Sequence, residues 1–261
     1  MAGGMWVAAA GLQATTWAID ALANDVANVD TAGFKAVLPD VSSIAPGANY
    51  PAGLAVGPNV QPQVLGGGGA EPLRLLLDTA QGPLQQTGDP LNLAVNGPGY
   101  FSLQGSNAVV YTRAGAFSLD ANRTVVDGQG QPLLDAKGKP LVVPAGATGL
   151  AVSQTGVLSA TVGGQPQTVG QIGLAMIPDP QQLVGLPGGD WSAPAAAGTI
   201  AIVTPGSGGS GPLASGYLED SNVSLAQVLP DLLAAERAYQ LNAQALSAST
   251  SMATKTNQLS L

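Results

Sequence analysis

The chain of 261 residues contains no cysteine and no histidine. Without cysteine it can form no disulfide, no thiolate nucleophile and no cysteine-based zinc or iron–sulfur site. Without histidine it has no Ser-His-Asp triad and no imidazole metal ligand. These absences exclude cysteine- and histidine-based sites, and we expect no catalytic residue, no bound metal and no cofactor.

Charge is also scarce, because only 9% of the residues are charged. Sixteen acidic residues against eight basic ones give a net charge of -8, which argues against nucleic acid as a partner. No apolar run reaches the roughly 18 residues of a membrane span, so we expect no membrane insertion. The opening residues lack the positive start of a secretory signal, and export would need another route.

Hydrophobic residues are plentiful at 45%, which is not the composition of an intrinsically disordered chain. Residues 4–28 contain no proline, and their apolar residues recur every seven positions. These positions are Met5, Leu12, Ile19 and Val26. The spacing predicts a helix with a coiled-coil seam. The opposite face is polar but nearly uncharged, which predicts burial against more protein.

The C-terminal residues repeat this pattern. Leu225, Leu232, Tyr239, Leu246 and Ala253 are again seven apart and predict a second helix. Pro230 falls within its second turn, where a proline removes a hydrogen bond. We expect either a kink there or a helix that starts near Asp231.

Two interpretations of the helical stripes stay open. Both helices could pack inside one globular domain. Alternatively, they could form a coiled coil, each pairing with the other or with a copy from another chain.

The middle of the chain is typical of antiparallel strands divided by turns. Residues 91–103 predict a hairpin around the turn Asn96-Gly-Pro-Gly99, and residues 150–177 predict an antiparallel sheet or small barrel. The predicted class is α+β, with paired terminal helices and a central β-rich domain. The expected organisation is an N-terminal helix (1–36), an extended connecting arm (37–90), a β-rich domain (91–204), a linker (205–219) and a C-terminal helix (220–261) that pairs with residues 4–28.

The chemical motifs are weak. Residues 206–211 satisfy G-x-G-x-x-G, but no helix is expected directly after them, as dinucleotide binding requires. A Gly/Ser linker is the preferred interpretation. The carboxylates Glu71, Asp78, Glu219 and Asp220 are assigned to helix capping or solvated loops, because no spacing pairs them as a glycosidase would need.

Three segments nevertheless match one known family. Residues 19–35, with Asn24, Asn28, Gly33, Phe34 and Lys35, resemble the N-terminal signature of flagellar rod and hook proteins. Residues 88–101, followed by Tyr111-Thr-Arg-Ala-Gly115, are similar to its middle motif. Residues 216–225 and 236–242 resemble its C-terminal motifs. The chain thus resembles the flagellar basal-body rod and hook protein family, and within it looks most like the distal-rod member.

The resemblance implies a structural subunit of the bacterial flagellar basal-body rod, exported by the flagellar type III apparatus. It implies self-assembly into a helical tube that transmits torque and carries the export channel, with the terminal helices lining the tube. Implied partners are copies of the same chain, neighbouring rod and hook proteins, the surrounding rings and the export apparatus. The expected assembly residues are Met5, Leu12, Ile19, Asn24, Val26, Asn28, Gly33, Phe34, Leu225, Leu232, Tyr239, Asn242 and Leu246.

Alternatives remain at this stage. A hook or proximal-rod subunit would share the same motifs. An extracellular carbohydrate-active hydrolase would need two carboxyl groups roughly 5–10 Å apart in a pocket. An adhesin-like β-domain with helical tails would keep its binding when the tails are deleted.

Overall fold

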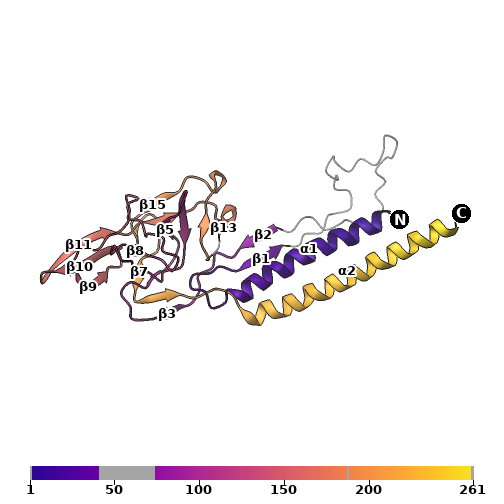
Figure 1. Cartoon of the computed structure of the whole chain (residues 1–261), viewed down its shortest axis with the longest axis horizontal. Coiled ribbons are helices and arrows are strands. Elements are labelled where there is room, and N and C mark those ends of the chain that lie inside the picture. Colours follow the sequence, from indigo (N-terminus) through magenta and orange to yellow (C-terminus); the bar gives the residue numbers. More distant parts are fainter. Residues whose placement is uncertain (1, 41–73, 187, 260–261) are drawn as a thin grey trace. The chain divides into compact units, whose positions relative to one another are not determined.

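The computed structural model describes residues 2–40, 74–186 and 188–259 (Figure 1). Their contacts divide them into two units. The helical unit contains the described residues up to Val26 and from Ser224 onward. It also contains the described residues between Val37 and Leu76. The β unit consists of Ala27–Ala36 and Leu77–Val223.

The helical unit contains both predicted helices. Helix α1 spans Ala2–Ala27 and helix α2 spans Leu225–Leu259. The suggested start near Asp231 is wrong, since α2 continues through Pro230. The Ser224 carbonyl already accepts the N–H groups of Gln227 and Val228, so the first turn has formed before the proline removes one bond of the second. A kink at Pro230 stays a prediction.

The two helices come close at one level of the helical unit. A Cβ built on Gly11 of α1 would lie 2.8 Å from Nδ2 of Asn242 on α2. Glycine therefore allows an approach that a larger residue would hinder unless Asn242 moved.

The β unit is built around a six-stranded antiparallel sheet of order β13-β14-β6-β5-β12-β15. The strands are β5 (Tyr100–Gln104), β6 (Val109–Thr112), β12 (Leu174–Met176), β13 (Val184–Gly185), β14 (Trp191–Ser192) and β15 (Ala201–Val203). Apolar side chains from these strands and their neighbours form one core, in which Leu93, Phe101, Leu103, Leu133 and Leu174 are fully buried.

Smaller sheets complete the described residues. Strands β9 (Thr148–Val152), β10 (Val157–Val162) and β11 (Gln165–Gln171) form a three-stranded antiparallel sheet. This confirms the antiparallel sheet predicted for residues 150–177 up to Gln171, whereas β12 joins the six-stranded sheet. The remaining pairs are β1 (Val37–Asp40) with β2 (Arg74–Leu77), β3 (Leu84–Gln86) with β17 (Tyr217–Glu219), β4 (Leu93–Val95) with β16 (Leu213–Ser215), and β7 (Ser118–Leu119) with β8 (Val125–Val126). Much of the predicted arm, residues 41–73, lies outside the described residues.

The predicted hairpin around Asn96-Gly-Pro-Gly99 is wrong. Strand β4 pairs with β16, whereas β5 pairs with β6 and β12. The turn bonds elsewhere: Asn96 N–H donates to the Pro212 carbonyl and Gly211 N–H to the Pro98 carbonyl. The backbone between the two strands is thus held by residues 211–212 rather than closing a hairpin.

The predicted linker is also wrong over its second half. Residues 213–215 and 217–219 form β16 and β17, and Leu213 is buried in the core. The Gly/Ser residues before them form a tight loop, in which the Ser210 hydroxyl donates to the carbonyls of Thr204 and Ser207. No helix follows until Leu225, so the geometry of a dinucleotide site is not formed.

A short repeat spans residues 125–140. Two apolar residues followed by Asp-x-x-Gly-x-Pro occur at 125–132, and the same pattern occurs again at 133–140. In each copy the aspartate Oδ1 accepts two backbone N–H groups of its own loop, and the glycine has a positive φ. Val125, Leu133 and Leu141 then bond to one another in a closed ring of three backbone hydrogen bonds of 2.8–3.0 Å.

In the part of the chain that the structure describes, neither α1 nor α2 combines the length and apolar character needed to cross a bilayer.

Candidate functional site

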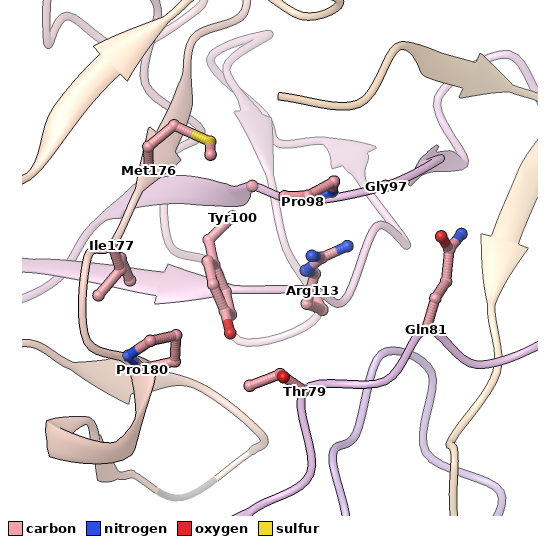
Figure 2. A pocket seen from close by; sticks show the side chains of 10 residues that line it. Thr79, Gln81, Gly97, Pro98, Tyr100, Arg113, Met176, Ile177 and Pro180 are labelled. Atoms are coloured by element: carbon pink, nitrogen blue, oxygen red, sulfur yellow. The ribbon is translucent and has the colours of Figure 1, made fainter. Parts of the chain in front are cut away.

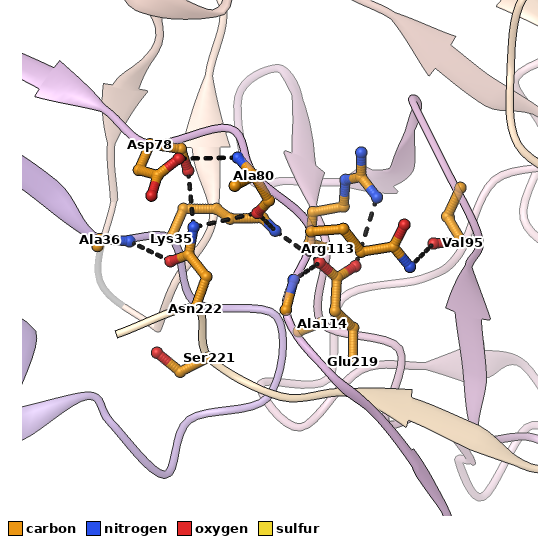
Figure 3. A network of polar contacts seen from close by, with 12 residues as sticks. Lys35, Ala36, Asp78, Ala80, Val95, Arg113, Ala114, Glu219, Ser221 and Asn222 are labelled. Carbon is orange, nitrogen blue, oxygen red and sulfur yellow. Dashed lines mark hydrogen bonds and ion pairs between the residues drawn. The ribbon is translucent and has the colours of Figure 1, made fainter. Parts of the chain in front are cut away.

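The most unusual polar group of the β unit is Glu219, a fully buried carboxylate at the end of β17 (Figure 3). Strand β17 pairs with β3 so that Glu219 lies opposite Leu84. The side chain reaches three donors that are far apart in the sequence. A buried carboxylate must be paired in this way, because an isolated one would cost several kcal/mol.

The donors surround both carboxylate oxygens. Oε1 accepts from Lys35 Nζ at 2.5 Å and from Gly82 N–H at 3.0 Å. Oε2 lies 3.3 Å from a terminal guanidinium nitrogen of Arg113. Lys35 also donates to the Ala80 carbonyl at 2.7 Å. We call Lys35, Gly82, Arg113 and Glu219 the carboxylate junction.

Burial sets the electrostatics of the junction. Lys35 is 1% exposed and Arg113 is 5% exposed. Burial lowers the pKa of Lys35, and the hydrogen bond and charge of Glu219 oppose this shift. Arg113 also lies over the Tyr100 ring, 5.0 Å from its centroid, a distance at which a cation is attracted to the ring face. One carboxylate therefore forms ion pairs with two buried cations.

Asn222 adds a second set of bonds next to the junction. Its Oδ1 accepts Ala36 N–H at 2.7 Å, and its Nδ2 donates to the carbonyls of Asp78 and Ala80 at 3.1 and 3.0 Å. Residues 34–36 and 78–80 are thereby both tied to the segment that leads into α2.

Glycines allow the backbones around the junction to touch. A Cβ on Gly33 would lie 2.3 Å from the backbone of Arg113 and Ala114, and Gly33 has φ +71°. A Cβ on Gly82 would lie 2.0 Å from the Asp220 carbonyl oxygen. Gly33 N–H donates to the Glu219 carbonyl at 2.7 Å. No side chain fits at either position without moving the backbone.

This arrangement is suited to joining distant segments of the chain. Its charged groups are buried and bonded to one another. Within the described residues, no three His, Cys, Asp or Glu side chains are grouped so as to hold a metal ion. The cavity beside Arg113 is lined by no carboxylate, so the carboxyl pair of a glycosidase is not formed there.

The structure places the expected assembly residues of α1 as follows. Met5, Leu12, Ile19 and Val26 are half-buried, and Asn24 is exposed. Among the α1 side chains that the structure describes, the buried positions are instead Ala8, Ala14, Ala18, Ala21, Leu22 and Asp25. In the turn that follows, Asn28 is half-buried, while Gly33 and Phe34 are buried. Oδ1 of Asn28 lies 3.2 Å from the Thr31 hydroxyl.

In α2, Leu232, Asn242 and Leu246 are half-buried, whereas Leu225 and Tyr239 are exposed. The predicted seven-residue seam is therefore only partly covered within one chain.

Sequence reasoning missed the junction. Glu219 was assigned to capping or a solvated loop, but it is 0% exposed. A signal was present, because Lys35, Arg113 and Glu219 lie one in each of the three motif segments.

Comparisons with known proteins agree with the three segments. Family models match residues 5–35 (flagella basal body rod protein), 94–160 (flagellar hook protein FlgE/F/G D1 domain) and 214–259 (flagellar basal body rod FlgEFG protein, C-terminal). The flagellar basal-body rod protein FlgG of Buchnera aphidicola from Schizaphis graminum is 31% identical, with 98% of each chain covered. The chain belongs to the flagellar basal-body rod and hook protein family.

Other rod proteins match over similar lengths. FlgG of Caulobacter vibrioides is 32% identical with 97% of each chain covered, and FlgG of Bacillus subtilis is 31% identical over 88% of this chain and 89% of its own. FlgF of Mesorhizobium japonicum is 28% identical over 90% and 88%. Each of the three family-model regions contributes one charged residue to the carboxylate junction.

Proposed function

We propose that this chain is a non-enzymatic structural subunit of the flagellar basal-body rod, most similar to the distal-rod member. It is exported and self-assembles into a helical tube that transmits torque and carries the export channel. Its partners are copies of itself, the adjoining rod and hook proteins, the basal-body rings and the export apparatus. The FlgG relatives, each called a flagellar basal-body rod protein, support this proposal.

The observation that carries it is the apolar surface of α2. Leu225, Leu229 and Leu233 are 41%, 48% and 55% exposed. Their spacing of four places them on one face of the helix. Leu241 and Met252 are still more exposed. Full burial of such a side chain stabilises a protein by about 1.5–3 kcal/mol relative to leaving it in water. This face of α2 is therefore suited to contact with another molecule.

The two terminal helices form a coiled coil in this proposal. The close approach of Gly11 and Asn242, the small buried residues of α1 and the buried Val228 of α2 support it. Copies of the chain complete the seams of Met5, Leu12, Ile19 and Val26 on α1 and of Leu225, Leu232, Tyr239 and Leu246 on α2. Contacts repeated by a screw operation produce a filament rather than a closed ring.

Assembly of the purified chain tests the proposal. Electron microscopy and sedimentation at rising concentration should reveal tubes or filaments. The double variant Leu229→Gln/Leu233→Gln should raise the critical concentration at least about tenfold. Val142→Gln, in the β unit at a site 53% exposed, is the matched control and should assemble normally.

Hydrogen exchange provides an independent readout. Amides of residues 4–28 should exchange rapidly in the monomer and be protected in the polymer. Strong protection in the isolated monomer, or equal assembly of the double variant and the wild type, would count against the proposal.

A further inference from the structure

A cavity of about 340 Å³ lies inside the β unit, next to the carboxylate junction (Figure 2). Pro98, Met176, Ile177 and Pro180 supply apolar walls. The polar part of the lining includes the Tyr100 and Arg113 side chains. Thr79 also lines the cavity and is exposed to solvent. A mostly apolar cavity with a few converging polar groups is the usual form of a binding site.

Arg113 is the group that gives this cavity its chemistry. The residue is 5% exposed, and among the described residues it forms a long ion pair of 3.3 Å with Glu219. Its buried Nε has no hydrogen-bond partner. A guanidinium carries five N–H donors. Glu219 accepts one of them and Tyr100 forms a further side-chain hydrogen bond, so donor capacity is left for another acceptor.

The two buried cations of the junction are paired unequally. Glu219 is shared with Lys35, which approaches it more closely. Asp78 adds attraction to Lys35. Arg113, at the wall of the cavity, is therefore the less compensated cation. In a site with little water this charge attracts an anion more strongly than it would at the surface.

We propose that this cavity receives a carboxylate side chain from a second copy of the chain, with Arg113 as its cationic partner and the apolar wall holding the methylene groups. The proposal rests on the proposed function, since a rod subunit meets its own copies. The chain offers many carboxylates of this kind, because it has sixteen acidic residues and only eight basic ones. Two of those eight, Lys35 and Arg113, are buried in the junction.

A carboxylate tethered at the cavity edge should compete with the incoming one. Thr79→Glu places a carboxylate on the wall of the cavity that Arg113 also lines, while Thr79→Gln has the same shape without the charge. We expect Thr79→Glu to raise the critical concentration for assembly at least about tenfold and Thr79→Gln to change it less than about twofold. Equal assembly of Thr79→Glu and wild type, or equal impairment of both variants, would overturn the proposal.

A small carboxylate tests the same cavity without assembly. Sodium isobutyrate, titrated into the monomer, should shift the Arg113 Nε–H resonance saturably in the millimolar range, and sodium chloride at equal ionic strength should not. Failure of the isobutyrate shift would overturn the proposed site. Failure of the wild type to assemble would instead overturn the rod function, and the titration would still decide whether the cavity binds a carboxylate.

Discussion

Lys35 and Glu219 are 184 residues apart in the sequence, and Nζ of the lysine lies 2.5 Å from Oε1 of the glutamate. The contact joins the segment that leaves α1 to the segment that leads into α2. Arg113, from the middle of the chain, reaches the other carboxylate oxygen. The β unit is therefore closed by its last strand, and the first prediction concerns this bond.

Glu219→Gln should destabilise the β unit by about 3–5 kcal/mol, because it leaves two buried cations without their common carboxylate. Urea denaturation in a Trp6→Phe/Trp17→Phe background, followed by the fluorescence of Trp191, which is buried in the β unit, measures the loss. Glu236→Gln on the exposed surface of α2 is the matched control and should change stability by less than about 0.5 kcal/mol. A loss no larger than that of the control would show that the junction contributes little to stability.

Asp25 should make the helical unit more stable at acid pH. This carboxylate is 0% exposed and accepts the Val37 N–H with both oxygens at 3.1 Å. Burial raises its pKa from 3.8 to about 6, and the Val37 bond opposes the shift only in part. The neutral acid is thus favoured in the folded state, so its stabilising effect is complete below pH 3.8 and is lost as pH rises through 6.

The size of this effect is about 3 kcal/mol between those limits, at 1.36 kcal/mol per pKa unit. Asp25→Asn should flatten the pH dependence of helix unfolding between pH 4 and 7 and raise stability at pH 8. Circular dichroism at 222 nm during urea unfolding of the polymerised protein would measure it. Asp20→Asn, at an exposed site of α1, should leave the slope unchanged, and an unchanged slope in Asp25→Asn would contradict the prediction.

The loop glycines of the 125–140 repeat should differ in their tolerance of alanine. Gly130 has φ +80° and Gly128 has no positive φ, yet a Cβ would meet nothing within 4 Å at either position. Gly130→Ala therefore isolates the left-handed backbone penalty, about 1–2 kcal/mol. Gly128→Ala in the same loop should be neutral or slightly stabilising. Thermal unfolding of both variants measures the difference, and equal melting temperatures would refute it.

The approach of α1 to α2 should be sensitive to volume at Gly11. Gly11→Leu places a side chain where Asn242 lies, and we expect it to lower helix protection in the polymer and weaken assembly. Asn242→Ala in the same chain makes room, so the double variant should recover part of the loss. Additive effects in this double-mutant cycle would mean that the two residues do not contact each other in the assembled state.

Sequence patterns were most informative for the helices. The absence of proline from 4–28 and the seven-residue spacing predicted α1 nearly to its ends, because helix formation depends on local spacing. The start of α2 was harder to predict. The local cost of Pro230 favours a later start, but it is outweighed by the rest of a thirty-five-residue helix.

Strand pairing was harder to predict. The turn Asn96-Gly-Pro-Gly99 has the local features of a hairpin, yet β4 pairs with β16, which is more than one hundred residues away. Glycine and serine likewise predicted a linker where Leu213–Ser215 forms that partner strand. Pairing of this kind depends on the whole core, because local turn residues do not fix the partner of a buried strand.

The sequence by itself determined the α+β class, the terminal helices and, through three motif segments, the family. Only the tertiary structure decided that Lys35, Arg113 and Glu219 share one buried carboxylate junction and that Gly33 and Gly82 lie against other backbones. The reason is physical: helical periodicity is a property of neighbouring residues, whereas charge pairing and close backbone contact arise when distant segments fold together and exclude water.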